Sequence, residues 1–479
     1  MTDPLWSSTQ AADATGGTTG TWSATGVSID TRNLVPGDLF VALTDVRDGH
    51  DFVVDALAKG AAAALVSRIP ENMDATDRLL VVPDVLQGLD ALARAARTRT
   101  NARVIAVTGS VGKTSTKEML RTALASQGSV HAAEKSFNNH WGVPLTLARM
   151  PAATDYAVIE IGMNAPGEIS PLSQLARPHV AIITNVEEVH MAAFSNIRGI
   201  AHEKAAIFDG LEPDGTAILN RDNRMYPVLA RRSRKSTSNL IRYGVAGRPE
   251  FALKRVSVGA EHTALTFRHD GNTYHAKIGA PGKHFAGNAL AVLAATDAVG
   301  ADMARAAIAL AHWCPPAGRG TRTRVVISDL DGHILLIDES YNANPTSMAA
   351  ALDALAETDV IHGTGRISKG RRIAIIGDML ELGDDEIARH KDIAGLGAMD
   401  AIDVVHTVGP LSETIHKLLP GQKRGRHFAT GTQAAAVIRR LLDPGDVVMV
   451  KASLGIALGE VVDAIKKLGQ GNSQQQDGA

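Results

Sequence analysis

Short apolar runs alternate with amphipathic stretches along most of the chain, which is the pattern of strands and helices in α/β proteins. Between residues 22 and 99, helices are expected from Asp51 to Gly60 and from Val85 to Thr98. The apolar runs of this region, which predict strands, fall at 39–43, 62–66 and 79–82. We therefore predict a compact α/β module at the N-terminus.

The middle of the chain continues the pattern with apolar runs rich in β-branched residues, each followed by a polar residue or a small-residue loop. Such runs are typical of parallel strands buried on both faces, and they lie at 104–107, 157–159, 180–183 and 217–219. A hairpin is expected from Leu253 to Ile278 around Asp270-Gly271, followed by a helix from Asn288 to Val299. The pattern predicts a central domain built on a parallel sheet.

A third set of apolar runs follows a boundary that is first rigid and then flexible, Pro315-Pro316-Ala317-Gly318-Arg319-Gly320. Asn344 and Pro345 predict the N-cap and first residue of a helix that ends near Glu357. Strands alternating with helices indicate a Rossmann-like domain, with strands at 334–337, 373–376, 404–405 and 447–450. We expect α/β domains at 1–100, 101–317 and 318–468, and a disordered, Gln-rich tail at 469–479.

Composition excludes several classes of protein. The 479 residues carry a net charge of −2, so no basic field indicates binding to nucleic acid or to an anionic membrane. No run of about 18 apolar residues occurs, and the polar N-terminus does not resemble an export signal. A single cysteine, Cys314, excludes an internal disulfide and a cysteine-based zinc site. We expect a cytoplasmic protein without a membrane span.

The strongest candidate for a functional site is the loop Gly109-Ser110-Val111-Gly112-Lys113-Thr114-Ser115, which follows an apolar run and precedes an amphipathic helix. Glycines let the backbone N–H groups of such a loop face a phosphate at a helix N-terminus. Lys113 is expected to reach the β- and γ-phosphates of a nucleotide, and the Thr114 hydroxyl to ligate Mg²⁺. Val107 replaces the first glycine of the usual GxxxxGK[ST] pattern, so this is a variant loop. The alternative is a glycine-rich turn that binds nothing.

Polar residues follow the other central strands. Glu160, Thr184-Asn185 and Asn220 come directly after apolar runs, and the carboxyl ends of parallel strands share one edge of a sheet. Glu160 is a candidate second ligand for the Mg²⁺ of the loop. His190 lies just downstream, although a lone histidine is more often structural. His284 and Asn288 are spaced i, i+4 and can share one helical face.

Together these motifs resemble those of the Mur ligase family of ATP-dependent amide-forming enzymes, over residues 27 to 467. The loop from Thr108 to Thr114 is similar to the family's ATP loop, including its missing early glycine. The other matching stretches are Phe137-Asn138-Asn139, Glu160 to Met163, Gly167-Glu168-Ile169, Thr184-Asn185, His190, Asp338 to Met348, Gly377 to Gly383, His390 and Lys451-Ala452-Ser453. Glu187, Val189 and Ala452 depart from the small residues usual in the family.

The resemblance implies a reaction. ATP would phosphorylate the terminal carboxylate of UDP-N-acetylmuramoyl tripeptide, and the amine of D-alanyl-D-alanine would attack the resulting acyl phosphate. In the family a second Mg²⁺ is held by a histidine and a carbamylated lysine, positions matched here by His190 and Lys204. The implied metal ligands are thus Thr114, Glu160, His190 and the Lys204 carbamate, and Lys113 completes the catalytic set. The alternative for Lys204 is an ordinary helix-surface lysine.

The resemblance also implies binding residues. ATP would contact Gly109 to Ser115, His284, Asn288, Arg319 and Asp338. The uridine nucleotide would contact Ser28, Asp30 and Arg32, although the two charged residues read on the sequence alone as solvated loop charges. The tripeptide, the dipeptide or the reaction centre would contact Asn138, Asn139, Tyr341, Asn342 and Asn344. We expect a monomer whose domains close over the site.

Two alternatives stand beside this interpretation. A sister ligase, such as MurE or a folylpolyglutamate synthetase, would share the loop but use another amine, and the stretch from Tyr341 to Met348 argues against it. A nucleotide-dependent switch would need the loop for conformational control. The absence of an NKxD guanine signature and the extra polar strand ends disfavour a switch.

Overall fold

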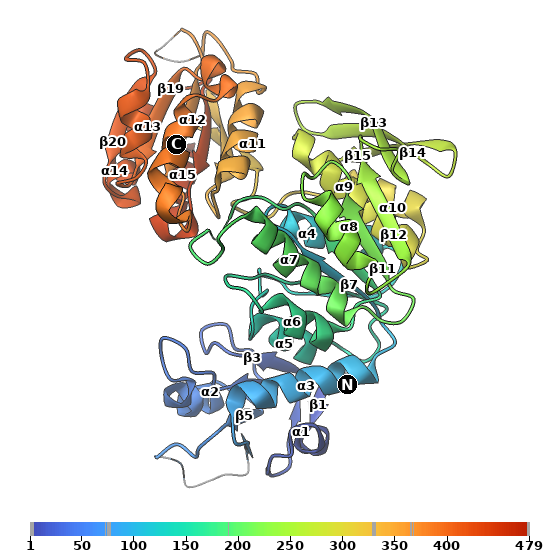
Figure 1. Cartoon of the computed structure of the whole chain (residues 1–479). Helices are drawn as coiled ribbons and strands as arrows, with labels where there is room; N and C mark the ends of the chain where they lie inside the picture. The colour runs from blue at the N-terminus through green and yellow to red at the C-terminus, as the bar shows by residue number, and fades with distance from the viewer. Residues whose placement is uncertain are drawn as a thin grey trace.

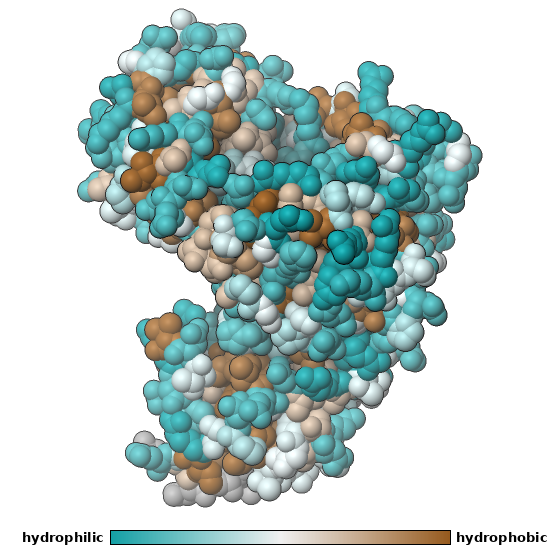
Figure 2. Space-filling view, in the orientation of Figure 1, coloured by the Kyte–Doolittle hydropathy of each residue, from teal (hydrophilic) through white to brown (hydrophobic). Residues whose placement is uncertain are grey.

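The computed structural model describes residues 4–71, 73, 78–189, 191–327, 332–364, 366 and 368–476. The chain forms three α/β lobes in sequence order, each built on one larger sheet, which confirms the predicted fold class. In Figure 1 the N-terminal lobe lies at the bottom, the central lobe in the middle and to the right, and the C-terminal lobe at the upper left. The surface is deeply notched between the first and last lobes (Figure 2).

The N-terminal lobe contains a parallel four-stranded sheet of order β3-β4-β5-β6 and a short antiparallel pair, β1 with β2. Its elements are β1 (Trp6–Ser7), α1 (Ser8–Thr15), β2 (Ser23–Ala24), β3 (Gly26–Ser28), β4 (Asp38–Val41), η1 (Gly49–Phe52), α2 (Val53–Ala58), β5 (Ala63–Val66), β6 (Leu79–Val81) and α3 (Val85–Arg99). Part of its core comes from further along the chain. Leu145 and Ala148 of α5 (Gly142–Ala148) pack into the cluster that holds Leu89 and Leu92 of α3.

The central lobe is built on a nine-stranded sheet of order β15-β14-β13-β12-β11-β10-β7-β9-β8. Strands β7 to β12 are parallel to their neighbours, and β13, β14 and β15 form an antiparallel extension. The strands are β7 (Arg103–Thr108), β8 (Val130–Ala132), β9 (Tyr156–Glu160), β10 (Val180–Ile183), β11 (Thr216–Asn220), β12 (Asn239–Gly244), β13 (Phe251–Val258), β14 (Thr263–His269) and β15 (Asn272–Ile278). Besides α5, the helices are α4 (Lys113–Ala125), α6 (Ile169–Ala176), α7 (Ile197–Ala205), η2 (Ala206–Gly210), α8 (Tyr226–Ser233), α9 (Lys283–Ala298) and α10 (Met303–Leu310).

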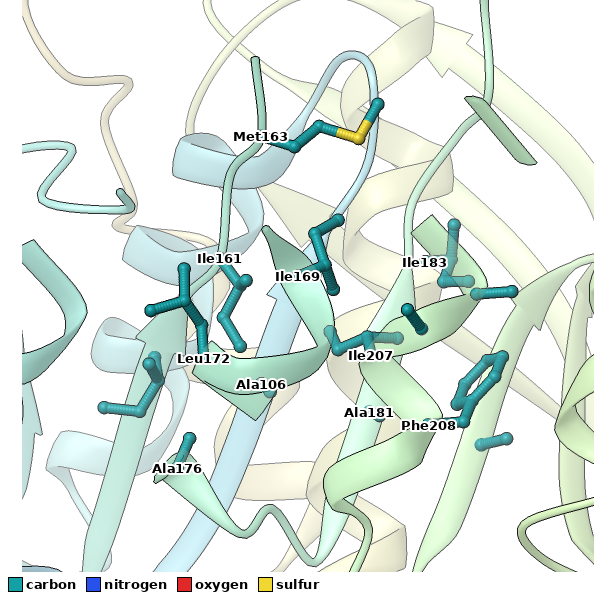
Figure 3. Close-up of a cluster of buried hydrophobic side chains, with 14 of the residues drawn as sticks. Ala106, Ile161, Met163, Ile169, Leu172, Ala176, Ala181, Ile183, Ile207 and Phe208 are labelled. Carbon is teal, nitrogen blue, oxygen red and sulfur yellow. The ribbon is translucent and has the colours of Figure 1, made fainter. Parts of the chain in front are cut away.

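Side chains of β7 alternate between two hydrophobic cores, because successive residues of a strand point to opposite faces. Ile105 and Val107 face the core under α4, α9 and α10. Val104 and Ala106 face the core under α6, η2 and α7, part of which is shown in Figure 3. Met163 lies at the upper end of that cluster in Figure 3 and also lines the cleft described below, so the core extends to the candidate site.

Two local predictions in this lobe need correction. The segment predicted as one hairpin forms three strands, because a second turn at 259–262 joins β13 to β14. The predicted turn at Asp270-Gly271 is present, with positive φ at both residues, as tight hairpin turns require. Helix α9 begins at Lys283 rather than Asn288, since Gly282 with φ +151° ends the preceding strand connection.

The C-terminal lobe has a six-stranded sheet of order β16-β17-β21-β18-β19-β20, parallel except for the edge strand β16. Its strands are β16 (Thr321–Val326), β17 (His333–Glu339), β18 (Arg372–Gly377), β19 (Val404–Val408), β20 (Arg424–Phe428) and β21 (Val447–Lys451). Its helices are α11 (Pro345–Ala356), η3 (Gly383–Asp385), α12 (Glu386–Ala394), η4 (Gly397–Ala401), α13 (Glu413–Leu418), α14 (Gly431–Leu441), η5 (Leu454–Ile456) and α15 (Gly459–Gln476). The apolar pattern missed the two polar edge strands, β16 and β20.

Two helices of this lobe, α11 and α15, can be compared with what the sequence predicts. Asn344 caps α11 as expected, with its side chain accepting from Ser347 N at 2.9 Å. Helix α15 continues to Gln476 and so enters the segment for which the sequence predicts a disordered tail. Its first turns pack on the sheet through Val461, Val462 and Ile465, and glutamine extends a helix readily. Across the described ranges, no helix is long and apolar enough to span a membrane.

Candidate active site between the central and C-terminal lobes

The phosphate loop joins β7 to α4, as predicted, and close neighbours require its glycines. Gly109 has φ +153°, and a Cβ there would lie 1.9 Å from Thr184 Oγ1. Gly112 has φ +85°, and a Cβ there would lie 2.8 Å from Asn288 Oδ1. The Thr184 hydroxyl also donates to the Val111 carbonyl at 2.6 Å. The loop is therefore clamped between the end of β10 and the first turns of α9.

Lys113 is half-buried in the first turn of α4, and its ammonium donates to the Gly109 carbonyl at 2.7 Å. Burial lowers the pKa of Lys113, and the charge of Arg319 lowers it further, whereas Glu160 opposes both effects. A bound phosphate would stabilise the charged ammonium, because an opposite charge favours the ionised form. The Lys113 ammonium can therefore leave the Gly109 carbonyl and donate to an anionic ligand instead.

Glu160 lies beside the loop and presents an unsatisfied oxygen. Its Oε1 accepts from the Thr114 hydroxyl at 3.1 Å and from Asn138 Nδ2 at 2.8 Å. The residue is 2% exposed, and Oε2 has no hydrogen-bond partner among the described residues. A buried carboxylate oxygen without a partner is costly unless a ligand completes it.

A magnesium ion fits this donor set. Mg²⁺ prefers one or two carboxylates together with phosphate oxygens and water, and a hydroxyl and a carboxylate meet here at the phosphate loop. Within the part of the chain that the structure describes, no group of three His, Cys, Asp or Glu side chains is arranged to hold a metal.

Arg319 reaches the site from the segment that joins the central and C-terminal sheets. Its guanidinium carbon lies 4.2 Å from the centroid of the Tyr341 ring, a cation–π contact. Its Nη2 donates to Ser136 Oγ at 3.1 Å, and Ser136 Oγ lies 3.0 Å from Thr114 Oγ1. The guanidinium is therefore held beside the phosphate loop from two sides.

These groups line one cleft of ≈ 430 Å³ between the central and C-terminal lobes. The structure brings together most of the residues that the sequence nominated, from segments far apart in the chain. Those that line the cleft are Ser110, Val111, Gly112, Lys113, Thr114, Ser115, Asn138, Asn139, Glu160, His284, Asn288, Arg319, Tyr341, Asn342 and Asn344.

Asp338 does not line the cleft, where we expected a contact with ATP. It is 3% exposed, and its carboxylate accepts from Gly318 N at 3.2 Å and from the Ser340 hydroxyl at 2.6 Å. These bonds tie the segment before Arg319 to the segment before Tyr341. Asp338 therefore fixes the positions of two residues that do line the cleft.

Lys204 lies on α7 with 1% of its surface exposed, so the alternative of a helix-surface lysine is wrong. Burial lowers the pKa of Lys204 well below its usual value, and the charge of Lys113 lowers it further. The neighbouring Glu203 accepts from Gly167 N and Ile169 N, both at 2.8 Å, and so orders the loop before α6. His190, the expected partner of Lys204, lies outside the described residues.

Ser28, Asp30 and Arg32 line a separate cavity of ≈ 1010 Å³ between the N-terminal and central lobes. Arg32 Nη2 lies 2.7 Å from Asp30 Oδ2, and this contact lowers the pKa of Asp30 to about 2. Residues of the segment 134–141 alternate between the two sites: Lys135 and Phe137 line the cavity, whereas Ser136, Asn138 and Asn139 line the cleft. One segment therefore borders both.

Ser136, Glu339 and Lys451 also line the cleft, and no role was assigned to any of them from the sequence, although Glu339 and Lys451 lie in stretches that match the family. Lys451 Nζ donates to the Asn342 carbonyl at 2.9 Å and lies 3.3 Å from Glu339 Oε2. Glu339 and Lys451 are register partners at the ends of β17 and β21, so the strand-end rule that found Glu160 could have found them. Ser136 lies in a loop and carries no comparable signal.

Family models of three Mur ligase domains match the chain: the Mur ligase family catalytic domain at 23–97, the Mur ligase middle domain at 107–296 and the Mur ligase glutamate ligase domain at 321–454. The chain is 37% identical over 441 residues to UDP-N-acetylmuramoyl-tripeptide-D-alanyl-D-alanine ligase of Bacillus subtilis, across 91% of this chain and 92% of that protein.

Solved structures agree with these matches. A crystal structure of MurF from Acinetobacter baumannii superposes with a TM-score of 0.81 at 26% identity, covering 97% of this chain and 99% of that one. A crystal structure of MurF ligase from Thermotoga maritima in complex with ADP gives a TM-score of 0.74 at 25% identity, with 93% and 98% covered. Since the matches extend through all three lobes, the chain belongs to the Mur ligase family.

Proposed function

We propose that this chain is an ATP-dependent ligase that joins D-alanyl-D-alanine to UDP-N-acetylmuramoyl tripeptide during synthesis of peptidoglycan precursors. The observation that carries the proposal is the single cleft lined by the phosphate loop, by Glu160 and by Tyr341 to Asn344. The relative from Bacillus subtilis, whose name states this activity, supports the choice of substrates.

The reaction has two steps. A carboxylate oxygen of the tripeptide attacks the γ-phosphorus of ATP, the bond to the β–γ bridging oxygen breaks, and ADP leaves. The amine of the dipeptide then attacks the acyl carbon, the bond to the phosphate oxygen breaks, and the amine loses a proton. Both reactants of the first step are anions, so the protein must mainly position them and neutralise charge.

The cleft residues suit this task. Lys113 and Arg319 bring two positive charges to the loop, and the backbone N–H groups at the start of α4 face the same space. Thr114 and Glu160 would hold Mg²⁺, which when bound neutralises phosphate charge as a Lewis acid. Asn138 orients Glu160 by donating to its Oε1. His284 and Asn288, at the start of α9, are assigned to the adenine side.

Lys204 is proposed to carry a carbamate and, with His190, to hold a second Mg²⁺. A neutral amine adds CO₂ and releases one proton, so a lysine whose pKa is lowered by burial is suited to the reaction. The product replaces a cation with two anionic oxygens, which are ligands that Mg²⁺ prefers.

The cavity lined by Ser28, Asp30 and Arg32 is proposed to hold the uridine nucleotide, leaving the tripeptide to extend past the segment 134–141 into the cleft. Its volume of ≈ 1010 Å³ is at the upper end of ligand pockets. Tyr341, Asn342 and Asn344 are assigned to the dipeptide side. Because the cleft residues come from two lobes, we propose that closure excludes water from the acyl phosphate. We further propose a cytoplasmic monomer, since one chain supplies every residue assigned here.

The test is release of ADP with the UDP-linked tripeptide alone, with D-alanyl-D-alanine alone and with both, always with Mg²⁺. Turnover that requires both substrates, and formation of the joined product by mass spectrometry, are expected. Lys113→Gln should abolish turnover, whereas Lys417→Gln on the exposed face of α13 should not change it. Turnover with a different amine, or without any acceptor, would overturn the assignment of the substrates.

A further inference from the structure

A chain of hydrogen bonds runs from the interlobe segment to the buried carboxylate of the cleft. Arg319 Nη2 lies 3.1 Å from Ser136 Oγ, which lies 3.0 Å from Thr114 Oγ1, and Thr114 Oγ1 lies 3.1 Å from Glu160 Oε1. All four residues line the same cleft. Arg319 lies in the segment that leads into the C-terminal lobe, and Ser136, Thr114 and Glu160 belong to the central lobe.

Donor and acceptor chemistry fixes the direction of this chain. A guanidinium only donates, a carboxylate only accepts, and each hydroxyl carries one proton. The Thr114 proton therefore points to Glu160, and Ser136 donates its proton to Thr114 Oγ1 while its oxygen accepts from Arg319. Both hydroxyls are oriented by the charged groups at the two ends.

The backbone that leads into Ser136 is tied to the helix that carries Thr114. Lys117 of α4 is fully buried, and its ammonium donates to the Ala133 carbonyl at 2.5 Å and to the Lys135 carbonyl at 3.2 Å. A buried lysine is rare unless its charge is paired, and Glu118 lies 2.9 Å away. Ser136 and Thr114 therefore move as one unit, and Arg319 is the member of the chain that a movement of the C-terminal lobe would displace.

Ligation of a cation by Thr114 Oγ1 uses the oxygen that now accepts the proton of Ser136. That oxygen has a second lone pair for the cation, so the cation and the Ser136 proton share one acceptor atom. Occupation of the site therefore alters the hydrogen bond from Ser136 to Thr114, and with it the hydrogen bond that holds Arg319. We propose that Ser136 is a positioning residue that couples occupation of the Thr114–Glu160 cation site to the placement of Arg319, and through Arg319 to the C-terminal lobe. This inference rests on the proposed use of ATP and Mg²⁺, and it is independent of which amine is the acceptor.

The experiment measures binding of a non-hydrolysable ATP analogue by calorimetry, with Mg²⁺ and with EDTA, so neither peptide substrate nor turnover is involved. The quantity of interest is the ratio of the two dissociation constants, the enhancement by Mg²⁺. Ser136→Ala should lower this enhancement about tenfold, as expected for loss of a hydrogen bond to a charged group. Ser136→Thr keeps the hydroxyl and should stay within about threefold of the wild type.

A double-mutant cycle separates positioning from a merely structural role. Arg319→Ala and the double variant Ser136→Ala/Arg319→Ala should show the same reduced enhancement as Ser136→Ala, because all three break one path. If Ser136→Ala lowers the enhancement as much in the Arg319→Ala background as in the wild type, the hydroxyl acts on the cation site without Arg319 and the proposal fails. An unchanged enhancement in Ser136→Ala would overturn it equally.

A second measurement tests the position of the C-terminal lobe. Small-angle scattering of the free protein should show a larger radius of gyration for Ser136→Ala than for Ser136→Thr, because Arg319 is no longer tethered to the central lobe. Equal radii would count against the coupling. Failure of these binding and scattering tests would leave the requirement for both peptide substrates untouched, so the two proposals fail separately.

Discussion

Arg389 of the C-terminal lobe and Glu188 of the central lobe form an ion pair, with 2.5 Å between Nη2 and Oε2. The other carboxylate oxygen of Glu188 lies 2.8 Å from Arg224, a residue of the central lobe. One carboxylate thus has one arginine partner on each lobe. The pair joins the central and C-terminal lobes and so contributes to their observed arrangement.

Arg389→Ala should loosen the C-terminal lobe, whereas Arg224→Ala, the matched control, removes an arginine from the same carboxylate without affecting the interlobe contact. Small-angle scattering at low salt should show a larger radius of gyration for the first variant only. The free energy of unfolding should change by less than about 1 kcal/mol in either, because these side chains are partly exposed and screened. Equal scattering curves for both variants would show that the ion pair does not hold the lobes.

Glu160→Gln should abolish ligase activity while keeping or raising thermal stability. The amide can still accept from Thr114 and Asn138, but it removes the buried, unsatisfied anionic oxygen that fits the cation. We expect a loss of about a thousandfold in activity, in line with loss of charge stabilisation at a catalytic centre. Binding of Mn²⁺ in the presence of the ATP analogue, followed by electron paramagnetic resonance, should weaken in parallel. A variant that binds Mn²⁺ as the wild type does would contradict the assignment.

Lys204 should make stability depend on pH and on CO₂. Its pKa is lowered from 10.5 by burial, so near neutral pH the unfolded chain binds a proton that the folded chain holds less well. The free energy of unfolding of the unmodified protein should therefore rise as the pH increases toward 10.5. In CO₂-free buffer, the difference in free energy of unfolding between wild type and Lys204→Met should rise with pH in this way. The corresponding difference between wild type and Lys59→Met, a change at an exposed position, should not depend on pH.

Bicarbonate gives the complementary measurement. It should raise the melting temperature and the activity of the wild type, because a reagent that binds only the folded state stabilises it. Lys204→Met should not respond. Full activity of Lys204→Ala at limiting bicarbonate would exclude a carbamate at this lysine.

Lys451→Met should destabilise the protein by about 3 kcal/mol, because it leaves Glu339 without its buried partner. The double variant Lys451→Met/Glu339→Leu should recover much of that loss, measured by denaturant unfolding. Lys417→Met, at an exposed pair, should cost less than about 1 kcal/mol. Activity should stay low in both Lys451 variants, since the Asn342 carbonyl loses its donor at the cleft. Recovery of full activity in the double variant would show that the pair serves stability alone.

Several features of the site could be predicted from the sequence because they are local. The phosphate loop follows from glycines between an apolar run and an amphipathic helix, and Glu160 follows from the end of the next strand. The cap at Asn344 is also local, since it depends on the residues of one helix turn. Edge strands β16 and β20 were missed because most of their residues are arginine, threonine, histidine or glycine, so neither strand contains the apolar run on which the prediction relied.

Other features depend on contacts between segments far apart. The N-terminal core takes Leu145 and Ala148 from the central lobe, and no periodicity in residues 1–100 indicates that those positions will be filled from outside. Asp338 was expected in the cleft, yet its oxygens bond to the backbone of Gly318 and Ser340. Whether a polar strand end faces a ligand or a neighbouring loop is decided by which loop packs above it.

The sequence by itself determined the α/β class, the three successive sheets, the variant phosphate loop and the strand-end carboxylate, because strand periodicity, glycine freedom and strand polarity act over a few residues. Only the tertiary structure decided that Lys204 is buried, that Lys451 pairs with Glu339, and that Ser136 joins Arg319 to Thr114. Burial and hydrogen-bond direction depend on which segments of different lobes come into contact. The chemistry available at the cleft therefore depends on these tertiary contacts.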